Sequence, residues 1–232
     1  MTTRSVLLVM LLFPVEAFAQ RVVDVDKFEG SALSFLRTVG GEPLANTKFI
    51  RVVEGSPYFN EEWMKGNVLI EESEYRNLYL RINVFETALE FLDTRGDAMV
   101  CTQPIKKVLL NDSIKGVQYH FIHSSFLPES PDIKRAWLMQ LADGPAGLYK
   151  LGKKTINEIR PYGSATTEQH IIDSYTYFVL YNNSMYKIKK TTDIPDILNN
   201  KKSAIAEFIK TNDLSSKAEK DMIRVINYYN TL

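Results

Sequence analysis

The feature that most constrains the fold is a strict two-residue alternation of side chains in the middle of the chain. In LYLRINVF, residues 78–85, aliphatic side chains occupy every second position, and polar or aromatic side chains fill the positions between them. This period predicts a β-strand with one face on the core. In SYTYFVL, residues 174–180, apolar side chains fall on both faces, so this segment is expected to be covered from both sides.

Similar short runs recur from residue 67 to about residue 190, separated by residues that favour turns. Thr94-Arg95-Gly96-Asp97 and Tyr181-Asn182-Asn183-Ser184 are two such turns, because Gly and Asn tolerate a positive φ. No helical period is interleaved with these runs. The pattern predicts a mainly β fold, an antiparallel meander that forms a sandwich or an open barrel.

The last forty residues change to a helical period. Apolar side chains recur at helical spacing in residues 201–211 and again in residues 222–229, with a break at Asn212-Asp213-Leu214. Ser216 and Glu219 have the spacing of a capping box. Because neither helix buries its stripe alone, we expect residues 191–232 to form a helical hairpin packed on a β-rich domain of residues 20–190.

The first nineteen residues have the pattern of a secretory signal peptide. Arg4 precedes a short apolar run, and Ala17-Phe18-Ala19 is a small-x-small cleavage motif, so we expect cleavage between Ala19 and Gln20. Pro14 and Glu16 end the run well short of the roughly 20 apolar residues that a spanning helix needs. The sequence thus predicts a periplasmic or secreted protein without a transmembrane segment in the mature chain.

Charge and cysteine content narrow the expected partners. The 232-residue chain has 28 Lys and Arg against 28 Asp and Glu, and this neutrality argues against nucleic acid as a partner. Its one cysteine, Cys101, lies in an apolar run, so it is expected to be a buried and inert thiol. The expected partner is an envelope component, a glycan or a small ligand.

No motif of a known catalytic chemistry is present in the sequence. It contains no Gly-x-Ser-x-Gly elbow, no Gly-x-Gly-x-x-Gly and no phosphate loop. His120 and His123 are the closest histidine pair, but they lie in a predicted strand, where positions i and i+3 face opposite ways. We therefore assign no catalytic residue, no cofactor and no metal site.

Two aromatic residues outside the predicted strands, Tyr58 and Trp63, are the weak candidates for ligand contact. The favoured interpretation is an exported, non-catalytic envelope or binding module. One alternative is a hydrolase that acts on a glycan or peptide through Asp and Glu side chains. The other is a carrier that holds an apolar ligand inside the β body.

Three stretches together resemble a group of secreted, uncharacterised proteins of Bacteroidota-type bacteria. They are residues 55–66 (GSPYFNEEWMKG), residues 80–91 (LRINVFETALEF) and residues 226–232 (INYYNTL). Ile82 departs from the pattern, since Tyr is commoner there. The resemblance implies an exported protein with a β-rich body and a helical tail that ends in Tyr-Tyr-Asn-Ser/Thr-Leu, and it implies no particular activity.

Overall fold

The computed structural model describes residues 21–24, 35–44, 50–163, 165–214 and 216–232. The predicted signal peptide, with Ala19 and Gln20, lies outside these ranges, so its cleavage stays a prediction. Within them, no helix combines the length and the apolar character that crossing a membrane requires.

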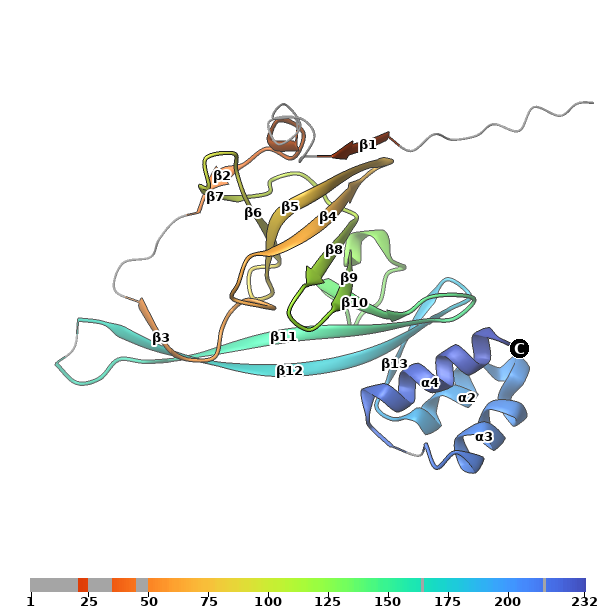
Figure 1. Cartoon of the computed structure of the whole chain (residues 1–232). Coiled ribbons are helices and arrows are strands. Elements are labelled where there is room, and N and C mark those ends of the chain that lie inside the picture. The colour runs from red at the N-terminus through yellow and green to blue at the C-terminus, as the bar shows by residue number, and fades with distance from the viewer. Residues whose placement is uncertain (1–20, 25–34, 45–49, 164, 215) are drawn as a thin grey trace, which may run out of the picture.

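The molecule is built on one sheet of 13 strands, which confirms the mainly β prediction (Figure 1). The strands are β1 (Arg21–Asp24), β2 (Glu42–Pro43), β3 (Ile50–Glu54), β4 (Met64–Ile70), β5 (Ser73–Asn83), β6 (Ala88–Leu92), β7 (Ala98–Val100), β8 (Lys107–Asp112), β9 (Val117–His123), β10 (Trp137–Ala142), β11 (Gly147–Ile159), β12 (Thr167–Tyr181) and β13 (Ser184–Ile188). Their order across the sheet is β13-β12-β11-β10-β9-β8-β4-β5-β6-β7-β2. This is a single open sheet, since β13 and β2, the first and last strands in that order, do not pair with each other.

The sheet consists of two antiparallel meanders joined side by side. Strands β8 to β13 pair in sequence order, and so do β4 to β7. The pairing of β4 with β8 joins the two meanders. Two short strands add parallel pairings that the sequence did not predict, β1 with β5 and β3 with β12.

The predicted alternation and turns are present. In β5, Leu80 and Ile82 are buried, as the two-residue period requires. In β12, the adjacent residues Phe178 and Val179 are both fully buried, which confirms that this strand is covered on both faces. The turn between β12 and β13 has Asn182 at φ 48° and Asn183 at φ 56°, the left-handed conformation that Asn tolerates.

The apolar side chains form three clusters. The largest lies among β4, β5, β6, β8 and β9 and includes Phe35 from a helical turn at residues 35–39. The second lies between the C-terminal helices and the β11–β13 end of the sheet. The third covers the opposite face of β9–β12, where Leu127 and Ile133 from the β9–β10 connection pack on Leu138 and Phe178.

The C-terminal helical element follows β13 directly. Its helices are η3 (Thr191–Asp193), α2 (Ile194–Ile197), η4 (Asn199–Lys201), α3 (Lys202–Thr211) and α4 (Glu219–Asn230). The expected capping box is wrong, because α4 begins at Glu219 with Ala218 as its N-cap. Ser216 instead donates a hydrogen bond to the Asp221 carboxylate and accepts one from the Ala218 N–H.

Polar contacts attach α4 to the sheet. Glu219, in the first turn of α4, lies 2.7 Å from Lys150 Nζ and accepts a hydrogen bond of 3.0 Å from the Tyr177 hydroxyl. Burial and this hydrogen bond raise the pKa of Tyr177 to about 12. A carboxylate at this position also suits the positive end of the helix dipole. The contact fixes the N-terminus of α4 against β11 and β12.

Strands β11 and β12 form a hairpin much longer than their neighbours. It is paired from Gly147 opposite Leu180 to Ile159 opposite Glu168. β10 and β13 flank only the end nearest the helices, and β3 flanks part of the far end. The far end projects to the left in Figure 1, away from the helices, and is called the arm below (residues 152–175).

Candidate functional site

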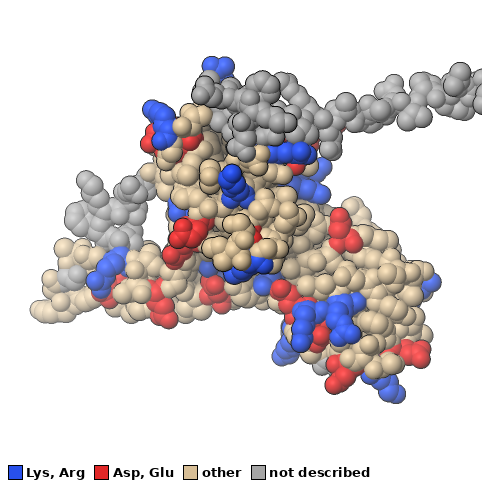
Figure 2. Space-filling model, viewed as in Figure 1, with Lys and Arg blue, Asp and Glu red and all other residues tan. Residues whose placement is uncertain are grey.

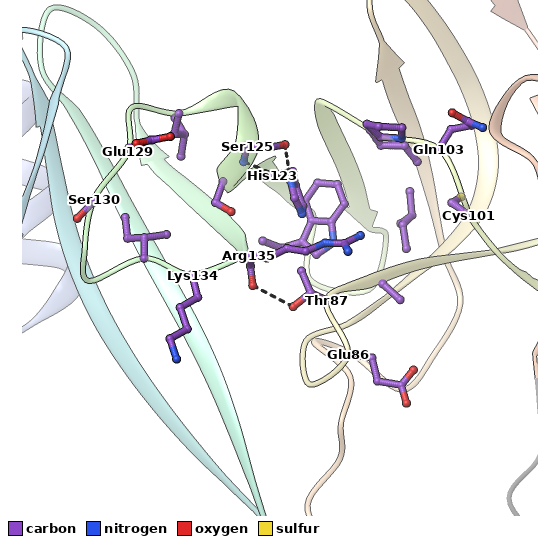
Figure 3. A pocket seen from close by; sticks show the side chains of 18 of the residues that line it. Glu86, Thr87, Cys101, Gln103, His123, Ser125, Glu129, Ser130, Lys134 and Arg135 are labelled. Carbon is purple, nitrogen blue, oxygen red and sulfur yellow. Dashed lines mark hydrogen bonds between the residues drawn. The ribbon is translucent and has the colours of Figure 1, made fainter.

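A cleft of about 1170 Å³ lies between the two meanders. One wall consists of residues 86–89 and 100–105, around β6 and the end of β7. The other wall consists of residues 123–137, which connect β9 to β10 (Figure 3). The cleft therefore lies where the two meanders face each other, next to the filled core of the β body.

The cleft has an apolar floor. Its apolar lining residues are Ala88, Leu89, Val100, Cys101, Ile105, Leu127, Ile133 and Trp137. Trp137 is 6% exposed, and its indole Nε1 has no hydrogen-bond partner among the described residues. A buried N–H group without a partner is costly, so this position has an unused donor next to the cleft.

The His123 ring lies in the cleft wall, edge to face with Trp137 at a centroid distance of 5.1 Å. Its Nδ1 accepts a hydrogen bond of 3.3 Å from the Ser125 N–H and lies 2.7 Å from Ser125 Oγ. A nitrogen that accepts these bonds is unprotonated, so the ring proton is on Nε2. Burial, and then the nearby charge of Arg135, lower the pKa of His123.

A serine hydroxyl bonded to an imidazole nitrogen is also the start of a hydrolytic triad. In a triad, a carboxylate holds the second ring nitrogen, and no described carboxylate bonds to His123. The arrangement instead caps the short helix η2 (Ser124–Phe126). The two glutamates of the cleft, Glu86 and Glu129, extend away from each other on opposite walls in Figure 3, so they do not form the acid–base pair of a glycosidase.

Arg135 is the charged residue that stands centrally in the cleft. Its side chain extends between His123 and Thr87 in Figure 3, and its carbonyl accepts a hydrogen bond of 3.3 Å from Thr87 Oγ1, which joins the walls. No described carboxylate forms an ion pair with its guanidinium. Lys134, its neighbour in sequence, points away from the middle of the cleft.

The structure places Tyr58 and Trp63 together, but outside this cleft. Both rings cover the Arg81 guanidinium, whose central carbon lies 3.9 Å from the Tyr58 centroid and 4.3 Å from the Trp63 centroid. Arg81 in turn lies 2.6 Å from Glu90, which is fully buried. Burial, and then the Glu90 charge, raise the pKa of Tyr58. These aromatic rings thus shield a buried ion pair.

The histidines are separated as predicted. His123 faces the cleft, whereas His120 lines a smaller hollow with Leu109 and Gln140 on the other face of the sheet. Across the described ranges, no group of three or more His, Cys, Asp or Glu side chains is arranged to hold a metal ion.

Sequence reasoning missed the cleft and Arg135. The signal that was available is the length of the β9–β10 connection, which runs for 13 residues from 124 to 136 and is the longest between consecutive strands from β4 to β13. Connections of this length inside a domain are uncommon and are often functional. Nothing in the sequence showed that residues 86–89 and 100–105 would face this connection.

Replacing Arg81 should strongly destabilise the protein. Arg81→Met leaves the Glu90 carboxylate buried without a counter-ion, so we expect the free energy of unfolding to fall by about 3–5 kcal/mol. Urea denaturation measures this change. Arg76→Met, which removes a partly exposed pair with Glu74, is the control and should cost less than about 1 kcal/mol. Equal losses of unfolding free energy in the two variants would show that the buried Arg81–Glu90 pair contributes no more to stability than the partly exposed Arg76–Glu74 pair.

His123 should make stability fall in mild acid. Because its pKa is lowered in the folded state, the unfolded chain takes up the proton first as pH falls below the ordinary value of 6.5. The contribution of neutral His123 to stability is therefore complete above that value and is lost as pH falls from it through the lower pKa of the folded state. His123→Asn retains an acceptor for the Ser125 N–H. Its urea midpoint should fall less between pH 7.5 and pH 5 than that of the wild type, and parallel curves would refute the assignment.

The Cys101 thiol should react slowly although it lines the cleft. Its side chain is largely buried, and burial raises the pKa of the thiol well above its ordinary range, which keeps the reactive thiolate scarce. We expect dithiobis(nitrobenzoate) to modify the native protein much more slowly than the protein unfolded in guanidinium chloride. Comparable rates in the two states would show a thiol accessible from the cleft.

Comparison with protein-family models, with curated proteins and with solved structures finds no match for this chain. The resemblance to secreted Bacteroidota-type proteins therefore stays a prediction, and the chemistry of the cleft is the basis for assigning a function.

Proposed function

We propose that this protein is an exported, non-catalytic binding module that holds a small amphipathic ligand in the cleft between its meanders. The ligand has an apolar body, which lies on the floor formed around Trp137, and an acidic or hydrogen-bond-accepting group, which binds Arg135. The central observation is the Arg135 guanidinium, which stands in the cleft without a described carboxylate partner.

The size and lining of the cleft support a small-molecule ligand. Its volume of about 1170 Å³ is slightly above the roughly 300–1,000 Å³ that is usual for ligand sites, and its lining combines apolar side chains with about as many polar ones. Donors in its lining include the Arg135 guanidinium and the Nε2–H of neutral His123. An acceptor group on the ligand would satisfy these donors.

The charges at the surface are compatible with this type of partner. On the face seen in Figure 2, Lys and Arg are interspersed with Asp and Glu, and neither sign forms a continuous field. Association with a small amphipathic ligand requires no such field, because burial of its apolar body supplies most of the driving force.

The two alternative functions are less well supported. A hydrolase requires convergent carboxylates, and Glu86 and Glu129 extend apart. A carrier with its ligand enclosed in the β body requires a hollow interior, whereas the core between β4–β6 and β8–β9 is filled by buried side chains such as Phe91 and Leu110. The cleft between the meanders could still hold an apolar ligand, as the carrier hypothesis requires, without a hollow core.

A fluorescent amphipathic anion tests the proposal. Anilinonaphthalene sulfonate has an apolar ring system and one sulfonate, so we expect one molecule to bind the native protein with enhanced emission. Arg135→Met should weaken this binding by about ten- to hundredfold, because a hydrogen bond to a charged group is lost. The measurement is a fluorescence titration with thermal denaturation to verify folding.

Lys134→Met is the matched control, since it removes the same charge from the adjacent residue, whose side chain points away from the middle of the cleft. It should leave the affinity for the dye within about twofold of the wild type. Equal weakening in both variants would indicate a general electrostatic effect, and absence of dye binding to the folded wild type would reject the cleft as an amphipathic site.

A further inference from the structure

The arm has one long edge that no described strand covers. β10 pairs with β11 only at residues 148–151, through contacts such as Leu138 opposite Leu151. From residue 152 to residue 159, β11 pairs with β12 alone. An uncovered edge of this length has unpaired backbone N–H and C=O groups and is able to pair with another strand.

The hairpin geometry identifies which backbone groups face outward. A side chain at Gly55, beside β12, would place its Cβ 2.2 Å from the Ile171 carbonyl oxygen, so this oxygen points away from β11. Ile171 lies opposite Ile156, and because its carbonyl points away from β11, the two residues form a non-hydrogen-bonded pair. In such a pair, the N–H and C=O groups of both residues point away from the partner strand. The N–H and C=O groups of Ile156, and of Lys154 and Glu158 two residues away, therefore face the open side.

A second contact agrees with this assignment. The Ser174 hydroxyl donates to the Lys153 carbonyl at 3.5 Å, which places the backbone of Lys153 toward β12. Residues 153, 155, 157 and 159 thus make the ladder bonds to β12, and the even-numbered residues form the open edge.

The side chains along this edge have opposite charges placed symmetrically about Ile156. Lys154 lies two residues before it and Glu158 lies two residues after it, on the same face of β11. Lys154 Nζ is 2.7 Å from Asp173, and Glu158 accepts a hydrogen bond of 2.8 Å from Gln169. The Lys154 side chain is only 11% exposed and its charge is paired with Asp173 of the same chain, whereas the Glu158 side chain is exposed.

We propose that the arm pairs with the arm of a second copy of this chain. The two β11 strands run antiparallel about a two-fold axis, with Ile156 opposite Ile156 of the second copy. Lys154 of each copy then lies opposite Glu158 of the other, and the outward groups form about six backbone hydrogen bonds.

The charge pattern favours a second copy over a strand of another protein. An edge with lysines alone resists pairing with any strand. Here, when β11 pairs antiparallel with β11 of a second copy, Glu158 of one copy lies opposite Lys154 of the other and has the opposite charge. Figure 2 shows side chains of both signs along the arm. Since the paired segment is short, we expect a weak dimer in the micromolar range.

Charge reversal provides a test that distinguishes this dimer from others. In Lys154→Glu, both positions 154 and 158 are acidic, and in Glu158→Lys both are basic. Lys154→Glu also places a carboxylate beside Asp173 of its own chain, so thermal denaturation first verifies that each variant is folded. Each folded variant alone places like charges opposite each other across the axis, so we expect its dimer to be about ten- to thirtyfold weaker than that of the wild type. An equimolar mixture of the two variants should recover the dimer, because every pair across the axis is again opposite in sign.

Sedimentation velocity of the full mature chain, over concentrations of about 1–200 μM, measures each state. Lys153→Glu is the matched control, since Lys153 lies opposite Ile159 of the second copy and has no charge partner there; its dimer should equal that of the wild type. A wild-type chain that stays monomeric, single variants that still dimerise, or a mixture that stays monomeric would each overturn the proposal. If the wild type is a monomer, a strand of another protein becomes the expected partner of this edge.

Discussion

The pairing of β11 with β12 is the constraint on which the rest of the structure depends. The two strands are in register from Gly147 opposite Leu180 to Ile159 opposite Glu168. At one end, Leu148 and Val179 are fully buried and support the C-terminal helices, while Tyr149 and Phe178 pack on the opposite side. At the other end, the same hairpin continues beyond the sheet as the arm. One continuous ladder therefore positions the helical element, the third apolar cluster and the open edge.

The fold could be predicted wherever it depends on local periodicity. The alternation in residues 78–85 and 174–180 correctly predicted β5 and β12, and the Asn182-Asn183 turn correctly predicted the hairpin that follows. The helical stripes predicted α3 and α4, although the start of α4 was placed too early. The parallel pairings of β1 and β3 were not predictable, because a short strand has no signal that specifies a distant partner.

The candidate site was beyond sequence reasoning for a related physical reason. The cleft exists only because the pairing of β4 with β8 brings two meanders together, so its walls are distant in sequence. Arg135 lies in a connection without regular structure, where no period indicates its direction. Tyr58 and Trp63 were correctly recognised as lying outside the strands, yet their rings are occupied by the Arg81 guanidinium. An aromatic residue in a loop is thus as well suited to covering a cation of its own chain as to binding a ligand.

The side-by-side arrangement of the meanders also has a consequence for how the chain reaches its native state. Hairpins between consecutive strands close short loops, which form in microseconds at little entropic cost. Joining β4 to β8 instead closes the 40-residue stretch between Val68 and Val108, and β5, β6 and β7 of this stretch lie on the other side of β4. Because non-local pairing slows folding, this seam between β4 and β8, together with the pairing of β3 with β12, is expected to limit the rate of assembly. Until it closes, both meanders present unpaired edges to the solvent, and the interval before closure is when the chain is most exposed to aggregation.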